Sequence, residues 1–141
     1  MALGIYLNFK GNCSDAVKYY SKVFRLEAPY ILTYGEMPGG NTNSMTEEEK
    51  KLVLHTHLNI KGTSVMFSDV PDSIPITFGD NITIVYKCKD SSEIKRIFSE
   101  LKEEGKVIEE LQKTFWSDLY GMVTDKYGIG WQFSLENDST N

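Results

Sequence analysis

The chain begins with a strict alternation of apolar and polar positions. The apolar set is Leu3, Ile5, Leu7 and Phe9, and the set between them is Gly4, Tyr6, Asn8 and Lys10. A period of two predicts a strand with one face buried more deeply than the other. Asn12 then stands where a helix N-cap would, with Asp15 three residues later. An apolar stripe at helical spacing follows: Ala16, Val17, Tyr20, Val23 and Phe24. We therefore expect a strand followed by a helix.

The rest of the first half predicts three more strands and one long connection. Residues 29–35 are expected to form a strand, and residues 36–51, with their Pro, Gly, Asn and charged residues, a mobile flap. Alternation returns over residues 52–60, and a Lys61-Gly62 turn predicts a hairpin with residues 63–68. The first half thus predicts a βαβββ module.

The same order of elements restarts near residue 81. Alternation over residues 81–88 predicts a strand, and Asp90 with Glu93 forms a capping-box signature for a second helix. Gly105 stands at the C′ position, where a glycine would end this helix. The helix carries the stripe Ile94, Ile97, Phe98 and Leu101, and the strands expected after it span residues 106–113, 118–124 and 129–136.

The two halves repeat in pattern more than in identity, which indicates an internal duplication. We expect one domain over residues 1–136, with module one at about residues 1–70 and module two at about 80–136, and a disordered tail at 137–141. A single module cannot bury both a strand face and a helix stripe, so the two should pair. The expected fold class is α+β, with two βαβββ modules forming curled mixed sheets around a cavity and helices on the outer face.

Composition limits which partners the protein could have and in which compartment it is expected. A net charge of −5 over 141 residues argues against a general nucleic-acid binder, because phosphate contacts need clustered Lys and Arg. No run of about 18 apolar residues occurs, and the first ten residues lack the features of a signal peptide, so no membrane partner is expected. Cys13 and Cys88 have no metal-binding or disulfide spacing. These observations predict a cytoplasmic protein with bystander thiols.

Four segments carry a resemblance to a known family. They are residues 6–12 (YLNFKGN), 19–24 (YYSKVF), 111–116 (LQKTFW) and 121–128 (GMVTDKYG). With the order of elements, they make the chain resemble the vicinal oxygen chelate superfamily of glyoxalase I, bleomycin-resistance proteins and extradiol dioxygenases. The segments resemble most its PhnB-like branch, which is often labelled a demethylubiquinone methyltransferase domain. The resemblance implies the glyoxalase/bleomycin-resistance fold and a homodimer. It does not lead us to expect methyl transfer, because no Gly-rich strand-to-helix turn is present.

The resemblance also implies positions for metal ligands. In metal-using members of the superfamily, the first and last strands of each half supply one ligand each. These positions correspond to Tyr6 and Met66 in the first half and to Thr83 and Gln132 in the second. A phenol, a thioether, a hydroxyl and an amide are poor ligands for a divalent metal, so we predict no metal and no cofactor. We expect these four residues and Asn8 to contact a small-molecule ligand instead.

Two further groups are candidates for the site. His55 and His57 lie two residues apart on a strand, so their imidazoles share one face. We assign His55 to the ligand-binding set and His57 to the role of general base, while metal binding by the pair stays an alternative. Phe115, Trp116 and Tyr120 could form an aromatic wall for a ligand, although aromatic residues more often fill a core.

The function expected from the sequence is small-molecule binding by a PhnB-like homodimer, with residues 36–51 roofing the cavity. One alternative is a metal-dependent lyase, isomerase or dioxygenase of the same superfamily, in which Gln132 and the histidines recruit the metal. A second alternative is an interaction module without a ligand. Metal content separates the enzyme from the other two, and saturable protection by a ligand separates the binder from the module.

Overall fold

The protein folds into two compact units, residues 1–76 and 77–141, and each is described by itself. The computed structural model describes residues 3–37, 39–40 and 42–137. A single domain over residues 1–136 stays a prediction. Of the tail expected to be disordered, residues 138–141 lie outside the described part of the chain.

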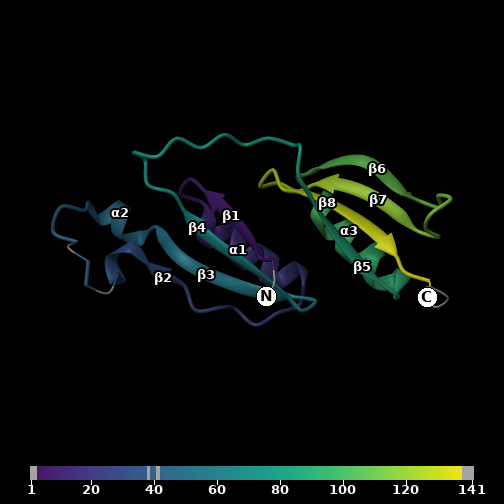
Figure 1. Ribbon diagram of the computed structural model, residues 1–141, viewed down its shortest axis with the longest axis horizontal. Coiled ribbons are helices and arrows are strands. Elements are labelled where there is room, and N and C mark those ends of the chain that lie inside the picture. The colour runs from purple at the N-terminus through teal and green to yellow at the C-terminus, as the bar shows by residue number, and fades with distance from the viewer. Residues whose placement is uncertain (1–2, 38, 41, 138–141) are drawn as a thin grey trace. The chain divides into compact units, whose positions relative to one another are not determined.

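The first unit has the predicted βαβββ order (Figure 1). Its elements are β1 (Ile5–Phe9), α1 (Cys13–Val23), β2 (Leu32–Thr33), the 3-10 helix η1 (Tyr34–Glu36), α2 (Glu47–Lys51), β3 (Val53–Ile60) and β4 (Thr63–Asp69). The strand order in the sheet is β1-β4-β3-β2, with β1 parallel to β4 and the other pairs antiparallel. Helix α1 packs against β3 and β4.

The second unit repeats this arrangement (Figure 1). It contains β5 (Thr83–Cys88), α3 (Ser91–Lys102), β6 (Lys106–Gln112), β7 (Tyr120–Thr124) and β8 (Gly130–Leu135). The strand order is β5-β8-β7-β6, again with the first and last strands parallel, and α3 packs against all four strands. The α+β class and the two βαβββ halves are therefore confirmed.

Each unit has its own core between its helix and its sheet, so the expectation that a single module cannot bury both a strand face and a helix stripe is wrong. In the first unit, Tyr20 of α1 stacks on Phe67 of β4 with ring centroids 5.9 Å apart, and Phe9 stacks on the other side of Phe67 at 6.3 Å. In the second unit, the predicted stripe of α3 is fully or almost fully buried, and Phe98 meets Phe133 edge to face at 5.9 Å. Burying each such side chain contributes roughly 1.5–3 kcal/mol, so these stripes account for the position of both helices.

Two strand boundaries differ from the sequence expectation. Leu3 lies before β1 and is 98% exposed, so the buried face of that strand begins at Ile5. The strand expected over residues 29–35 is reduced to β2, because η1 starts at Tyr34. The segment expected to be a flap contains the short helix α2, whose N-cap Thr46 accepts a hydrogen bond from the Glu49 amide.

The backbone conformation of the turn residues agrees with the expected β3–β4 hairpin but differs from the expected end of α3. Lys61 and Gly62 both have positive φ, 51° and 87°, as a two-residue hairpin with the right-handed strand twist requires. After α3 the left-handed residue is Glu104, with φ 60°, and not Gly105. A Cβ on Gly105 would lie 2.4 Å from the carbonyl oxygen of Thr124, so this glycine is needed for close backbone packing. The expected role of Gly105 as a C′ residue is wrong.

The N-terminus of α1 is capped from a distant strand. Asn12 occupies the N-cap position without a side-chain hydrogen bond, which corrects the expectation from the sequence. Instead, Asp69 at the end of β4 accepts hydrogen bonds from the amides of Gly11 (2.7 Å) and Cys13 (3.1 Å) with one carboxylate oxygen. Its other oxygen accepts from the amide of Val53 at 2.9 Å. This one buried carboxylate joins α1, β3 and β4.

The described helices include none with the length and apolar character needed to cross a bilayer. 

Candidate functional site

In each unit, one face of the sheet carries the helix and the other does not. Val65 and Phe67 of β4 point toward α1 and are buried, so the residues that alternate with them lie on the opposite, helix-free face. The register places Tyr6, Met66 and His57 side by side in one row across β1, β4 and β3. The helix-free face of the first sheet therefore gathers the predicted residues Tyr6, Asn8, His55, His57 and Met66.

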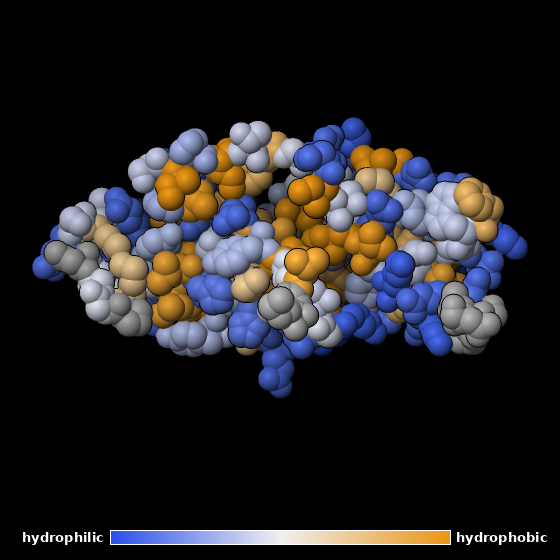
Figure 2. Space-filling view, viewed as in Figure 1, coloured by the Kyte–Doolittle hydropathy of each residue, from blue (hydrophilic) through white to orange (hydrophobic). Residues whose placement is uncertain are grey.

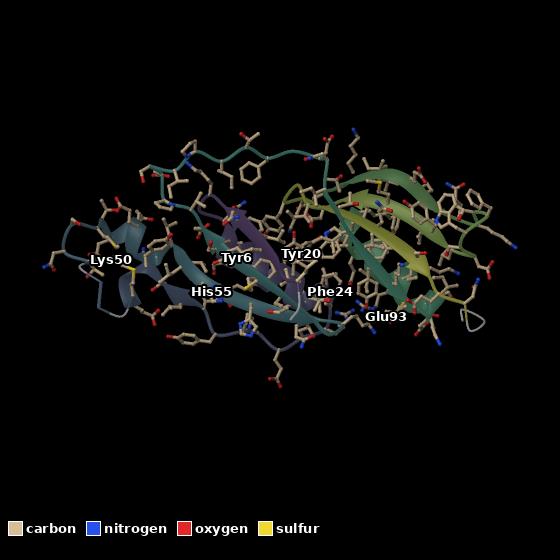
Figure 3. All side chains as sticks on the ribbon, viewed as in Figure 1. Tyr6, Tyr20, Phe24, Lys50, His55 and Glu93 are labelled. Atoms are coloured by element: carbon tan, nitrogen blue, oxygen red, sulfur yellow. The ribbon has the colours of Figure 1, made fainter. Side chains whose placement is uncertain are left out.

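Tyr6 and His55 form a polar contact on this face (Figure 3). The Tyr6 hydroxyl lies 3.1 Å from Nδ1 of His55, and the ring centroids are 5.8 Å apart. If the phenol donates this hydrogen bond, Nδ1 is the acceptor and the neutral imidazole carries its proton on Nε2. The ring of His57 lies 6.4 Å from that of His55. The sequence singled out His57 as a general base, but the tyrosine partner belongs to His55.

The helix-free face of the second sheet carries a chain of three polar side chains. The Gln132 amide nitrogen donates to the Thr83 hydroxyl at 2.7 Å, and the Tyr120 hydroxyl donates to the Gln132 amide oxygen at 2.7 Å. The pKa of Tyr120 is raised, first by burial and then by the nearby Glu109 carboxylate, so the phenol keeps its proton and acts as a donor. The chain fixes both ends of the Gln132 amide.

Two exposed aromatic rings pack next to Tyr120, the last residue of this hydrogen-bonded chain. The ring of Trp116 packs edge to face on Tyr120, with centroids 5.2 Å apart, and Phe115 packs in the same way on Trp116 at 4.7 Å. Trp116 is 53% exposed and Phe115 97% exposed. The predicted residues Thr83, Gln132, Tyr120, Trp116 and Phe115 thus form one contiguous group. Figure 2 shows apolar surface over the second unit, and Val85 and Ile108 of this sheet are also exposed apolar residues.

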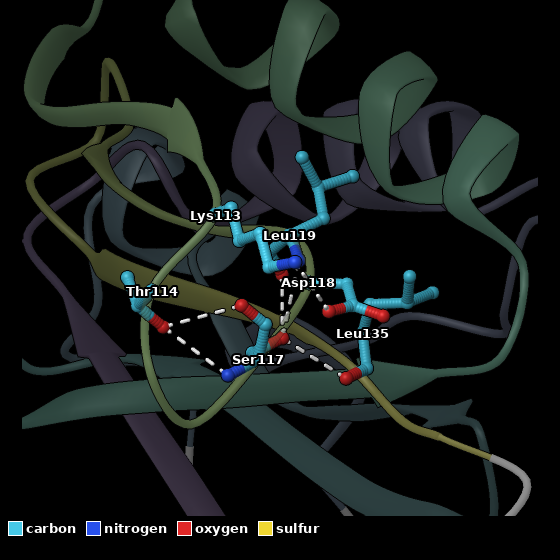
Figure 4. Close-up of polar contacts among 6 residues, drawn as sticks. All are labelled: Lys113, Thr114, Ser117, Asp118, Leu119 and Leu135. Carbon is cyan, nitrogen blue, oxygen red and sulfur yellow. Dashed lines mark hydrogen bonds and ion pairs between the residues drawn. The ribbon is translucent and has the colours of Figure 1, made fainter.

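A buried serine that the sequence analysis missed holds the aromatic loop between β6 and β7. The Ser117 hydroxyl lies 2.9 Å and 3.0 Å from the carbonyl oxygens of Leu119 and Leu135 (Figure 4). The Ser117 amide donates to the Thr114 hydroxyl, and the Thr114 amide donates to the Ser117 carbonyl. The T-x-x-S spacing was a sequence signal for such a turn. Trp116 lies inside this closed turn, so the turn fixes its backbone while its ring is exposed.

Each unit contains a cavity that is lined by described residues. The smaller has a volume of about 120 Å³ and lies on the helix-free face of the second sheet. Its lining residues are Asp80, Thr83, Ile108, Met122, Thr124, Gly128 and Gly130. A Cβ on Gly130 would lie 2.9 Å from a methyl carbon of Thr83, so the absence of a side chain makes room for this threonine. The larger cavity, of about 330 Å³, lies in the first unit and contains none of the individually predicted site residues.

The superfamily resemblance implies a metal, and the donor set does not fit one. Of the four side chains at the expected ligand positions, Thr83 and Gln132 are hydrogen-bonded to each other, and the Tyr6 hydroxyl contacts His55. None of the four offers an imidazole, carboxylate or thiolate. Over residues 3–37, 39–40 and 42–137, no three His, Cys, Asp or Glu side chains gather as a metal site would require.

Comparison with known proteins gives the family. Residues 2–134 match the model of the family described as 3-demethylubiquinone-9 3-methyltransferase. The chain belongs to this family. Protein YjdN of Escherichia coli K12 is 34% identical over 141 residues, which cover 96% of this chain and 95% of YjdN. The family description is the label that the sequence analysis attached to the PhnB-like branch, so that part of the resemblance is confirmed.

Solved structures give the fold. Protein PA1353 of Pseudomonas aeruginosa has a TM-score of 0.84 at 28% identity, over 98% of this chain and 99% of PA1353. The PhnB protein of Bacillus cereus has a TM-score of 0.73 at 24% identity, over 96% of this chain and all of that one. The expected fold of the glyoxalase/bleomycin-resistance type is confirmed by its structural neighbours.

Proposed function

We propose that this family member is a small-molecule-binding protein whose ligand contacts the helix-free face of the second sheet. The observation that carries the proposal is the group of Thr83, Gln132 and Tyr120 beside the exposed ring of Trp116. An apolar wall with a few fixed polar groups is the usual composition of a ligand site. Membership of the wider vicinal oxygen chelate superfamily is part of the same proposal and rests on the resemblance.

The polarity of the hydrogen-bonded group indicates which ligands fit. The Thr83 hydroxyl accepts from Gln132, so its own proton can be donated elsewhere, and Gln132 has a second amide N–H. Both groups would donate to an acceptor on the ligand, while the ring of Trp116 would stack on an apolar or planar part. We therefore propose a ligand with a flat or apolar body and a carbonyl or carboxylate group.

The face of the first sheet supports an alternative. Tyr6 orients His55, and His57 lies in the next position of the same face, so an imidazole base is available for proton transfer. In the enzyme alternative, a lyase, isomerase or dioxygenase would use His57 as general base. The poor donor set described above is the reason to rank this second.

The methyltransferase in the family description does not enter the proposal. The connections that lead into the two long helices, α1 and α3, are residues 10–12 and 89–90, and Gly11 is the one glycine in these two segments. The N-terminus of α1 already holds the Asp69 carboxylate, which occupies the amides that a bound anionic group would use. These turns lack the glycine-rich form that cradles a nucleotide-type cofactor.

Two further parts of the proposal concern assembly and compartment. We propose a homodimer, because the resemblance implies one, and light scattering on a size-exclusion column tests it directly. A cytoplasmic location is supported by Cys13 and Cys88, which are both buried thiols outside any disulfide. Burial and the Asp69 carboxylate raise the pKa of Cys13, so its thiol stays protonated and unreactive.

The test begins with protein purified without chelators or a histidine tag. Its metal content is measured by mass spectrometry, and its melting temperature is followed during titration with zinc, nickel, manganese and iron. A stoichiometric metal or a saturable shift of several degrees would favour the enzyme alternative. If neither is found, a metabolite screen by the same thermal assay should identify ligands, because binding to the folded state raises the melting temperature.

Matched variants then locate the ligand. Thr83→Val, Gln132→Leu and Trp116→Ala should each weaken binding of a hit from the screen, whereas Phe78→Ala, which removes another exposed aromatic ring, should not. Trp131 is almost fully buried, so a change in tryptophan fluorescence on binding should be lost in Trp116→Phe. Equal binding by all variants would contradict the proposed site.

A further inference from the structure

The larger cavity is a separate feature of the first unit. It has a volume of about 330 Å³, which is at the lower end of the range for small-molecule sites. It lies where β3 begins and β4 has ended, and α2 contributes one side of it. Its lining residues are Tyr34, Met45, Glu49, Leu52, Pro71, Asp72 and Ser73.

The lining combines an apolar surface with negative charge. Tyr34, Met45 and Leu52 are half-buried and form most of the apolar wall with Pro71. The Tyr34 side chain is fixed, because its hydroxyl donates to the carbonyl of Asp69 at 3.0 Å. Burial and the nearby Asp69 and Tyr6 raise the pKa of the Tyr34 phenol, so it adds no charge at neutral pH. Among the described residues that line the cavity, the ionisable groups besides this phenol are the carboxylates of Glu49 and Asp72.

The neighbouring lysines neutralise other acids. On α2, Lys50 pairs with Glu47 at 3.1 Å and Lys51 pairs with Glu48 at 3.7 Å. Within the part of the chain that the structure describes, neither Glu49 nor Asp72 forms an ion pair. The three consecutive glutamates of α2 are therefore not equivalent, since only Glu49 lines the cavity and only Glu49 lacks a lysine partner.

We propose that this cavity binds a small organic cation, an ammonium group carried on an apolar body. The apolar body would fill the wall of Tyr34, Leu52 and Met45, and the ammonium would lie toward Glu49 and Asp72. The tyrosine ring suits a cation as well as an apolar group, because its face carries negative potential. A carboxylate or phosphate ligand would be repelled by the two acids. The inference does not depend on the function proposed for the helix-free face of the second sheet.

Three probes with the same phenyl ring and similar size test the role of charge. Benzylammonium should bind with a saturable signal in titration calorimetry, and binding should weaken as salt is raised, because exposed charges are screened. Benzyl alcohol should bind at least about threefold more weakly, and benzoate should not bind, as expected for one partly exposed charge interaction. Equal binding of benzylammonium and benzyl alcohol, or no binding of benzylammonium, would overturn the proposal.

Three variants test the location. Glu49→Gln and Asp72→Asn should each weaken benzylammonium binding at least about threefold. Glu48→Gln is the control, because it makes the same change in net charge on the same helix but removes a residue outside the cavity. Ser73→Trp, a change at an exposed lining residue, should block binding without lowering the melting temperature. The proposal is overturned if Glu48→Gln weakens binding as much as Glu49→Gln, or if Ser73→Trp leaves binding unchanged.

Discussion

Trp131 donates its indole N–H to a carboxylate oxygen of Asp125 at 2.9 Å, and both side chains are almost completely buried. The other oxygen of Asp125 accepts from the amides of Tyr127 at 2.8 Å and Ile129 at 3.1 Å. One carboxylate thus fixes the turn between β7 and β8 and also the largest side chain of the second core. Because β8 follows directly after this turn, the carboxylate also helps to align the strand that carries Gln132.

Replacing Asp125 by Ala should destabilise the second unit strongly. The substitution leaves three donors without this acceptor, and a buried unsatisfied donor costs about 1–3 kcal/mol. We expect the free energy of unfolding to fall by about 3 kcal/mol or more in urea titrations followed by the fluorescence of Trp131. Asp118→Ala is the control, because Asp118 is exposed and lies 3.9 Å from Lys113, and its loss should change stability by under about 0.5 kcal/mol. Similar small effects of both substitutions would contradict this role.

Asp69→Ala should have a comparable effect in the first unit. The carboxylate caps α1 and also holds the first residue of β3, so its removal leaves the amides of Gly11, Cys13 and Val53 without their acceptor. We expect a loss of about 2–4 kcal/mol. Asp15→Ala, at an exposed position in the first turn of α1, should cost no more than about 1 kcal/mol. Hydrogen exchange at the Val53 amide should accelerate in Asp69→Ala, and unchanged exchange there would show that the contact is not needed.

The end of α3 yields two substitutions with opposite effects. Gly105→Ala should destabilise the protein by more than about 1 kcal/mol, because the new Cβ would meet the backbone oxygens of Thr124 and Leu101. Glu104→Gly should be neutral or stabilise by up to about 1 kcal/mol, since a glycine adopts positive φ without strain. Thermal unfolding of the two variants beside the wild type measures both effects. If Glu104→Gly were the more damaging, the left-handed residue would not be strained.

Stability should fall at alkaline pH through Tyr86. Burial, and then the hydrogen bond of its hydroxyl to Glu93 at 2.8 Å, raise its pKa above the ordinary value of 10.0. Below the ordinary pKa both states hold the proton and the contribution is complete. Above it the unfolded state loses the proton while the folded state retains it, so the free energy of unfolding decreases as pH rises. Tyr86→Phe should show a shallower decrease between about pH 8 and pH 11 in urea titrations. An unchanged slope would contradict the assignment.

Periodicity in the sequence was enough to predict the elements that hold each core. The stripe of α3 was complete because residues at helical spacing need no distant information, and the Lys61-Gly62 hairpin follows from two adjacent residues. Asp69 and Asp125 could not be predicted in this way. The partners of Asp69 are backbone amides up to 58 residues away. Every residue except proline has a backbone amide, so such a partner cannot be recognised from residue type. Gly105 was found for the wrong reason, since its requirement comes from the β7 backbone.

In the candidate site too, local features could be predicted from the sequence and contacts between distant residues could not. Alternation predicted that His55 and His57 share one face of their strand and that Tyr6 lies opposite the apolar side of its own, because the face within a strand follows from odd and even positions alone. That Tyr6 reaches across β4 to His55, and not to His57, depends on strand order and register, which the sequence did not give. The larger cavity was not predicted, because residues 34, 45–52 and 71–73 meet only through the path of the chain around the sheet.

The two units have the same strand order but differ in the length of chain between their parallel strands, and this difference bears on how the sequence can evolve. Ile5 pairs with Val65, 60 positions later, whereas Thr83 pairs with Gly130 after only 47. Because the entropy of closing a loop grows with the logarithm of its length, the longer first half costs only about 0.2 kcal/mol more. The connection that contains α2 and borders the larger cavity can therefore lengthen, shorten or exchange its side chains with little effect on the sheet. New ligand preferences could arise there while both cores keep their sequence.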